Sequence, residues 1–302
     1  MKVFVTGASG FVGSAVVQEL LQAGHTVTGL ARSDASAAAI LAAGAQVHRG
    51  DLTDHDAVIK GALAADATLH LGFNHDFSRY VASCAEEDAL VRALGIALAN
   101  TGKVLVVTSG TAVVIANPVA TETSAVISHH PRALSETAAA EAARAGTRTL
   151  VVRLPPSVHG KGDKGFVPML VGIAKAKGMS AFVGEGANEW PSVHRVDAAV
   201  LYRLAMEDAF KVSSAEKQVT IVHAVADTGV AFKGIASIIG KRLGVPVKSI
   251  TADEAENVFG FLHIFISMQN ATSAEVTRQR YGWTPTQPGL LADLDSDAYF
   301  SS

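Results

Sequence analysis

The stretch that decides the fold is residues 1–14, MKVFVTGASGFVGS. Its apolar, β-branched run ends at Thr6, three glycines follow at a spacing of three, and an apolar helical repeat begins at once. This order predicts a buried parallel strand, a tight turn and a helix whose N-terminus faces a ligand. Such a helix end carries unpaired N–H groups and the positive end of the helix dipole, so it favours an anion. An incidental glycine-rich turn is the alternative interpretation.

Each glycine of the turn has its own expected role. Gly7 permits backbone angles that are closed to other residues, Gly10 lets the backbone approach a pyrophosphate, and Gly13 lets the helix pack closely on the strand. A dinucleotide is therefore the expected cofactor. The residues expected to contact it at this turn are Gly7, Ser9, Gly10, Phe11, Val12 and Gly13.

The composition narrows the class of protein. The 302 residues are 49% hydrophobic and 18% charged, which is ample for a large core, and the formal net charge is −3. That charge gives no electrostatic case for binding nucleic acid or an anionic membrane. Cys84 is the single cysteine, so an intramolecular disulfide is excluded. No apolar run reaches the length of a membrane span, and we expect a soluble, cytoplasmic protein that acts on a small molecule.

Strand and helix patterns alternate through the first half of the chain. Beyond the turn, strands are expected at 25–31, 45–49, 66–71, 103–108 and 149–154, with helical patterns between them. This alternation predicts an α/β fold with a doubly wound parallel sheet, the Rossmann arrangement. The dinucleotide-binding domain is expected at 1–160 and is rejoined by a strand near 219–224, while 161–302 form mainly a smaller, mixed C-terminal substrate lobe.

Three features of the C-terminal half have expected structures. The stretch Trp190–His194 is interpreted as a break before a helix. The apolar stretch 254–269 is interpreted as lobe core or as a dimer face. A helix at 272–281 is expected to be the last one, because Pro285 and Pro288 prevent its continuation.

The residues after the second strand favour one cofactor over the other. An acidic residue there would suit the ribose hydroxyl of NAD, and a basic one suits the 2′-phosphate of NADP. The chain has Arg32 and Ser33 at this place, with Asp34 one position too late. A guanidinium can bind a phosphate in a bidentate manner, so NADP is favoured and NAD is the alternative. Arg32 facing solvent, or stacking on adenine, is the other interpretation of this residue.

Further residues at the ends of the predicted strands are expected to meet the cofactor. Asp51 and Leu52 follow the third strand, where the carboxylate could accept a hydrogen bond from adenine or cap the next helix. Leu71 and Gly72 end the fourth strand. The loop 73–77 comes next, at the edge where open α/β sheets bind ligands, so its polar residues face either substrate or solvent.

These motifs resemble the extended short-chain dehydrogenase/reductase superfamily, in its epimerase and dehydratase branch. The residues that carry the resemblance are the glycine turn, Asp51-Leu52, Thr108-Ser109-Gly110, 152–160 (VRLPPSVHG) and 193–199 (VHRVDAA). The resemblance implies that Pro155, Pro156 and Val158 lie along the nicotinamide ribose and that Ser109 hydrogen-bonds the reacting oxygen. It also makes a homodimer the common arrangement.

The chain departs from this family at the catalytic pair. The family uses Tyr-x-x-x-Lys on the helix after the serine, where a cation lowers the tyrosine pKa. Here Arg132 stands at the tyrosine place and Glu136 at the lysine place, and no tyrosine occurs between Tyr80 and Tyr202. His159 replaces the tyrosine of the family's Val-Tyr-Gly turn. The sequence therefore resembles the atypical members of the superfamily.

The candidate catalytic residues are those that could replace the missing acid. They are Ser109, Arg132 and His130, with His75 and His159 as alternatives. Arg132 would act as an electrostatic clamp on an oxyanion, whereas histidine titrates in the useful range. No metal site is expected. Three functions stay open: an NADP-dependent reductase or dehydrogenase of a small carbonyl or alcohol, a redox-neutral epimerase, dehydratase or isomerase, and a non-catalytic NADP-binding sensor.

Overall fold

A parallel sheet carries the N-terminal glycine turn. The computed structural model describes residues 1–211 and 218–300. The strand order is β10-β6-β5-β4-β1-β2-β3, with every neighbouring pair parallel. The strands are β1 (Lys2–Thr6), β2 (Thr26–Ala31), β3 (Gln46–Arg49), β4 (Ala67–His70), β5 (Val104–Gly110), β6 (Arg148–Leu154) and β10 (Thr220–His223).

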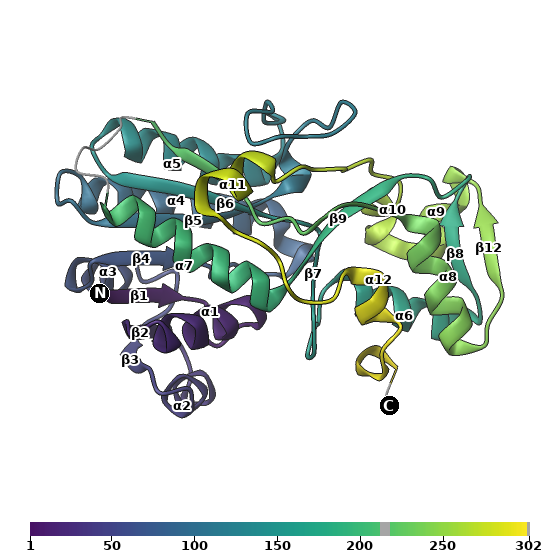
Figure 1. Cartoon of the computed structure of the whole chain (residues 1–302), viewed down its shortest axis with the longest axis horizontal. Helices are drawn as coiled ribbons and strands as arrows, with labels where there is room; N and C mark the ends of the chain where they lie inside the picture. The colour runs from purple at the N-terminus through teal and green to yellow at the C-terminus, as the bar shows by residue number, and fades with distance from the viewer. Residues whose placement is uncertain (212–217, 301–302) are drawn as a thin grey trace.

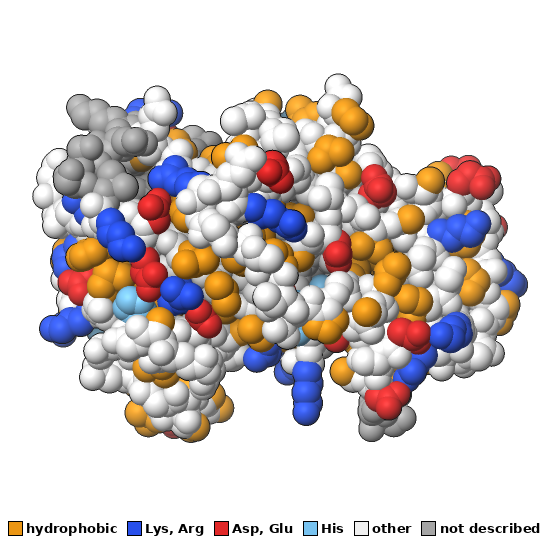
Figure 2. Space-filling model, in the orientation of Figure 1, with side chains coloured by type: hydrophobic (Ala, Val, Ile, Leu, Met, Phe, Trp, Pro, Cys, Tyr) orange, Lys and Arg blue, Asp and Glu red, His pale blue; other side chains and the backbone are white. Residues whose placement is uncertain are grey.

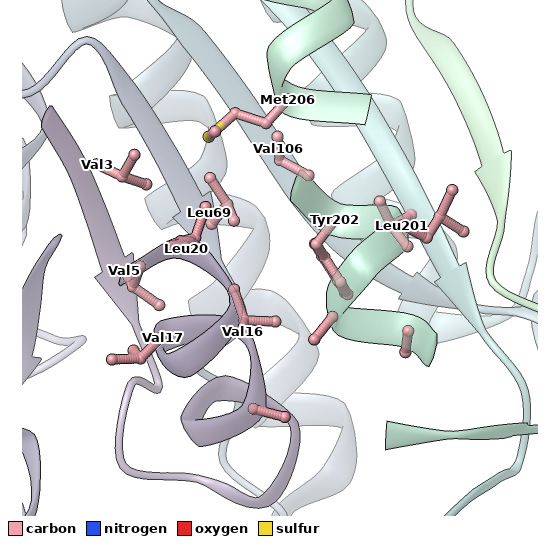
Figure 3. Close-up of a cluster of buried hydrophobic side chains, with 14 of the residues drawn as sticks. Val3, Val5, Val16, Val17, Leu20, Leu69, Val106, Leu201, Tyr202 and Met206 are labelled. Carbon is pink, nitrogen blue, oxygen red and sulfur yellow. The ribbon is translucent and has the colours of Figure 1, made fainter. Parts of the chain in front are cut away.

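Helices cover both faces of this sheet, which confirms the predicted α/β doubly wound fold (Figure 1). They are α1 (Phe11–Gln22), α2 (Asp34–Ala42), α3 (His55–Ala64), α4 (Tyr80–Leu98), α5 (Leu134–Arg144) and α7 (Arg195–Lys211). Alternate residues of each strand face opposite layers, since Val3 and Val5 pack with α1 and α7 whereas Phe4 packs with α3 and α4. Figure 3 shows α1 and α7 side by side on the face of the sheet to which Val3 and Val5 point.

The starts of three helices near the glycine turn differ in how they are capped. The side chain of Ser33 accepts a hydrogen bond from the N–H of Ser36 at α2, and Asp54 accepts one from Ala57 at α3. Asp54 therefore fills the capping role that the sequence left open for Asp51. At α1 the residue before the helix is Gly10, which has no side chain to form a cap.

A second lobe follows β6 and has its own apolar core. It contains α6 (Phe166–Lys177), β8 (Ser180–Val183), α8 (Phe232–Leu243), β12 (Val247–Ile250), α9 (Ala252–Phe259), the 3-10 helix η4 (Gly260–Leu262) and α10 (His263–Ile266). Strands β8 and β12 pair in parallel. The stretch 254–269 supplies Phe259, Leu262 and Ile266 to this core, while Phe261 and Ile264 stay exposed.

A three-stranded sheet joins the two lobes. Its strands are β7 (Ser157–His159), β9 (Glu189–His194) and β11 (Asp227–Ala231), in the order β11-β9-β7. The interpretation of Trp190–His194 as a break was wrong, because these residues form most of β9. Pro191 suggested the break, since proline cannot donate to a ladder. It lies between Trp190 and Ser192, where the pairing with β11 is irregular, so its missing N–H is tolerated.

The last described residues run from the sheet domain to the lobe. Helix α11 (Glu275–Tyr281) is followed by Trp283, whose indole N–H donates to the carbonyl of Asp197 at 3.0 Å. The chain then reaches α12 (Leu290–Leu294), in the lobe core, and the 3-10 helix η5 (Asp297–Tyr299). Helix α12 corrects the expectation that 272–281 would be the last helix. Figure 1 shows this segment in yellow, crossing between the lobes.

Two surface properties complete the description. Acidic and basic side chains are interspersed on the face shown in Figure 2, without a large area of one sign. Among residues 1–211 and 218–300, no helix is both long enough and apolar enough to cross a membrane.

Candidate cofactor and active site

The glycine turn is packed so closely that side chains are excluded from it. Gly7 has a φ of 67°, and a Cβ on it would lie 2.8 Å from the backbone nitrogen of Gly72. A Cβ on Gly13 would lie 2.0 Å from the carbonyl oxygen of Gly7. The turn, the start of α1 and the residue after β4 therefore meet as backbone against backbone, which the predicted roles of Gly7 and Gly13 require.

The start of α1 is open to an anion. It has no side-chain cap and no acidic residue in its first turn, in contrast to α2 and α3. Ser9 and Gly10 are exposed, and the chain then turns into the helix at Phe11 and Val12. The guanidinium of Arg195 lies 4.9 Å from the ring centre of Phe11 and adds positive charge at this end. These features fit the pyrophosphate of a dinucleotide.

The residues expected to contact the adenosine of the dinucleotide follow β2 and β3. Arg32 is exposed there and contributes to the lowered pKa of Asp51, although the hydrogen bond from the N–H of Thr53 is the main cause. Leu52 reaches Gly72, since a Cβ on Gly72 would lie 2.9 Å from a methyl of Leu52. Among the described residues, Arg32 forms no ion pair with a carboxylate. The Ser33 hydroxyl, in contrast, already accepts a hydrogen bond as the cap of α2.

The other predicted cofactor residues lie at the carboxyl ends of β4 and β6. Leu71 is half-buried beside Gly72, and its backbone also contacts Gly7. Pro155 is buried, while Pro156 and Val158 are half-buried on the path from β6 into β7. Leu154 pairs with Gly110 of β5, so this path starts at the same edge of the sheet as Ser109.

A buried histidine lies directly beneath the glycine turn. The hydroxyl of Thr6 accepts a hydrogen bond from the N–H of Gly72 at 3.0 Å and lies 2.8 Å from Nδ1 of His70. The Thr6 hydroxyl can donate to Nδ1 or accept from it, so this contact allows either tautomer of neutral His70 and leaves Nε2 for a further partner. This Nε2 is buried with no hydrogen-bond partner among the described residues. Burial, helped by the charge of Arg132, lowers the pKa of His70 to about 4.

The lowered pKa of His70 predicts a loss of stability in acid. The unfolded chain binds a proton at this residue below about pH 6.5 and the folded chain only near pH 4, so protonation favours unfolding as the pH falls. As the pH falls from about 6.5 to about 4, we expect this effect of His70 to lower the free energy of unfolding by about 3 kcal/mol in total. Urea titrations over this range should show a flatter dependence for His70→Gln. The exposed His129→Gln should keep the wild-type dependence, and identical slopes for all three proteins would contradict the prediction.

Ser109 belongs to a buried chain of polar groups. Its hydroxyl donates to Oε1 of Glu136 at 2.7 Å. Glu136 forms a two-point ion pair with Arg153, at 2.9 and 2.7 Å, and Arg153 donates to Nε2 of His223 at 3.2 Å. All four residues are at most 6% exposed. Glu136, at the family's lysine place, is therefore bound to a cation and holds the serine in one orientation.

Arg132 is the central cation of the candidate active site. Its guanidinium pairs with the buried carboxylate of Glu87, donates to the carbonyl of Thr108 at 3.2 Å and lies 3.8 Å over the ring of Phe73. Burial raises the pKa of Glu87 to about 7, against the opposing effect of Arg132. Arg132 is held from three sides at the carboxyl ends of β4 and β5, where the sequence predicted an electrostatic clamp.

The predicted histidines occupy different environments. Nδ1 of His130 accepts a hydrogen bond from the N–H of Arg132 at the start of the 3-10 helix η3 (Pro131–Ala133), so its proton lies on Nε2. Burial is the main cause of the lowered pKa of His130, which favours its neutral form, whereas His75 is exposed in the loop after β4. His159 is fully buried and pairs with Asp293 of α12 at 2.9 Å. His130 thus adjoins Arg132, whereas His159 ties β7 to the C-terminal segment.

Several residues of this region were missed at the sequence level. They are Phe73, Tyr80, Glu87, Arg153 and Arg195. Arg153 and Arg195 lie within the family-like stretches 152–160 and 193–199, and Phe73 lies within the loop 73–77, but the sequence assigned none of the three a role. A charged residue within an apolar strand is itself a signal of a buried ion pair, and could have indicated Arg153. The other contacts join residues far apart in the chain and leave no local pattern. Among the described residues, no cluster of three or more histidine, cysteine or acidic side chains could hold a metal ion.

The family assignment follows from this geometry together with the sequence. The model of the NAD dependent epimerase/dehydratase family matches residues 3–221, from β1 to β10. The chain belongs to this family. Its extended short-chain dehydrogenase/reductase fold, recognised from the motifs, is thereby confirmed, and the matched range ends in the strand that rejoins the sheet.

Two curated proteins are similar to this chain in sequence, one over its whole length and one over about two thirds of it. An uncharacterised protein of Schizosaccharomyces pombe is 47% identical over 302 residues, covering 99% of this chain and 100% of the relative. A 2-alkyl-3-oxoalkanoate reductase of Stenotrophomonas maltophilia is 30% identical over 227 residues, covering 68% of this chain and 66% of the relative.

Solved structures share the fold at low sequence identity. UDP-glucose-4-epimerase of Stenotrophomonas maltophilia, solved with NAD and a formylated UDP-arabinopyranose, has a TM-score of 0.76 at 18% identity and covers 99% of this chain and 97% of its own. A human epimerase family protein solved with NADPH has a TM-score of 0.72 at 21% identity and covers 98% of both chains. Both forms of the nicotinamide dinucleotide therefore occur among proteins of this fold.

Proposed function

We propose that this family member is an NADPH-dependent oxidoreductase that interconverts a small carbonyl compound and its alcohol. The bound reduced nicotinamide would supply a hydride to the carbonyl carbon. The electron pair of the C=O bond then moves to oxygen, which takes a proton that comes ultimately from water, so the product is the alcohol. Arg132 and His130 are the residues proposed to act on that oxygen, because the proton of the Ser109 hydroxyl is already donated to Glu136.

The position of Arg132 carries this proposal. Three contacts hold its guanidinium at the carboxyl ends of β4 and β5, next to the glycine cradle. A preorganised cation there stabilises negative charge as it develops on the carbonyl oxygen. His130 is fixed against Arg132 with its proton on Nε2 and can donate a hydrogen bond. The reductase activity in the name of the Stenotrophomonas maltophilia relative supports the same class of reaction.

The direct test is NADPH consumption with a panel of aldehydes and ketones. We expect the NADPH absorbance to fall in step with formation of the matching alcohol. Turnover of a nucleotide sugar without net consumption of cofactor would instead establish the epimerase alternative. Tight binding of NADPH without turnover of any compound would establish the sensor alternative, and either outcome overturns the proposal.

The preference for NADP rests on Arg32. Arg32→Ala should weaken NADP binding about tenfold to a hundredfold, because a charge-assisted contact to the 2′-phosphate is lost. NAD binding should change by less than about threefold. Calorimetric titration with each oxidised cofactor measures both effects, with Arg144→Ala as an exposed arginine control at the end of α5. Equal losses for the two cofactors would remove the 2′-phosphate assignment.

A further inference from the structure

Aromatic rings from both lobes meet next to Arg132. The loop after β4 and the start of α4 contribute Phe73, Phe77 and Tyr80, and the lobe contributes Phe166 and Phe261. We name these five side chains the ring junction. Phe73 lies under the Arg132 guanidinium, so the junction is continuous with the candidate active site.

Phe77 lies at the centre of the ring junction. Its ring stacks on Tyr80 at 6.0 Å and on Phe261 at 5.0 Å, each with 25° between the ring planes. Phe166 approaches Phe77 at 6.0 Å and is anchored in the lobe by Phe265, at 4.8 Å. The junction is thus built by specific stacking between residues that lie far apart in the chain.

The junction also keeps apolar surface accessible. Phe261 is 47% exposed although it stacks on Phe77, and Phe73, Phe77, Tyr80 and Phe166 are half-buried. Half-exposed rings of this kind next to a reaction centre gain contact area when a flat apolar group covers them. A substrate ring is the chemical match for such a surface.

The charges around the ring junction do not suit a diphosphate. Arg132 is paired with Glu87, and Arg79, at the start of α4, is paired with Glu86 at 2.8 Å. Both cations already have a carboxylate partner, so a diphosphate would meet little excess positive charge here, whereas a single developing oxyanion can still be stabilised by the Arg132 N–H groups.

We propose that the ring junction binds the apolar ring of an aryl aldehyde or aryl ketone, and that nucleotide sugars are not the substrates. The inference rests on the proposed reductase function and names its substrate class. The carbonyl group would point to Arg132 and the ring would lie against Phe261, Phe77 and Tyr80.

The test compares substrates and ring variants. We expect kcat/KM for benzaldehyde to exceed that for propanal at least tenfold, with no turnover of UDP-glucose. Phe261→Ala should raise KM for benzaldehyde about tenfold, leave kcat within twofold and leave propanal unaffected, because a single aromatic contact is lost. Phe261→Tyr should restore the wild-type KM. Phe210→Ala, at an exposed ring on α7, is the matched control.

A binding measurement separates this inference from the proposed function. Benzyl alcohol added to the NADP-loaded protein should bind in an NMR saturation-transfer experiment, and Phe261→Ala should weaken the signal. If NADPH is never consumed but this binding occurs, the proposed function fails and the ring-binding inference stands. Turnover of propanal equal to that of benzaldehyde, unchanged KM in Phe261→Ala, or binding of UDP-glucose in place of benzyl alcohol would overturn the inference.

Discussion

Replacing Arg153 by methionine is expected to lower the free energy of unfolding by about 3–5 kcal/mol. Arg153 is 2% exposed and is the two-point partner of Glu136, so its removal leaves a buried carboxylate without a cation. Chemical denaturation followed by circular dichroism measures this loss. The effect is large because the penalty comes from the charge left behind, more than from the contact removed.

A matched pair of variants identifies the cause. In Arg153→Met with Glu136→Leu, both charges are absent, and we expect at least half of the lost stability to return. Arg280→Met removes an exposed arginine that pairs with Asp208 at 3.1 Å, and its cost should stay below about 1 kcal/mol. A single Arg153 variant as stable as the Arg280 variant would contradict the role assigned to the buried pair.

Replacing Arg132 by glutamine is expected to reduce kcat about 100-fold to 1000-fold with a carbonyl substrate. Glutamine retains hydrogen-bond donors but loses the charge that would stabilise the oxyanion. Because Glu87 would otherwise be left buried without its cation, the variant is best combined with Glu87→Gln. Single-turnover kinetics with saturating NADPH measure the chemical step without the contribution of product release.

The controls for Arg132 separate catalysis from folding and cofactor binding. Glu87→Gln alone retains the guanidinium, so its kcat should stay within about tenfold of the wild-type value. Arg92→Gln removes a half-exposed arginine of α4 that pairs with Asp88 and Glu141, and should leave kcat unchanged. The proposed role is wrong if the double variant binds NADPH normally and reduces substrate at the wild-type rate.

The cofactor cradle could be predicted because its determinants are local. Strand, turn and helix follow one another within fourteen residues. Gly13 packs against Gly7 in that same stretch, and Gly7 packs against Gly72 after the end of β4, which is a neighbour of β1 in the sheet. The repeated βα pattern then fixed the sheet, because parallel strands require helical crossovers. Rules about short stretches of sequence were therefore sufficient to predict the glycine turn and the parallel sheet.

The side-chain contacts of the candidate active site could not be predicted from the sequence, because they join residues that lie far apart in the chain. Arg132 meets Glu87, 45 residues away, and Arg153 meets His223, 70 residues away. No periodicity encodes such pairs. Pro191 shows the opposite failure, since a local rule indicated a break where an irregular register with β11 accommodates the proline. Tertiary context decided both cases.

The return of the chain to the sheet has a consequence for dissecting the protein. A fragment ending at residue 160 would retain the glycine turn but lose α7 and β10. Helix α7 covers α1 in the first core layer, so the fragment would leave Val16 and Leu20 exposed to water. The edge of β6 that pairs with β10 would also be exposed, and an unpaired strand edge promotes strand pairing between molecules. The lobe therefore cannot be removed by a single cut, because the chain enters it before α7, again after β10 and once more at α12.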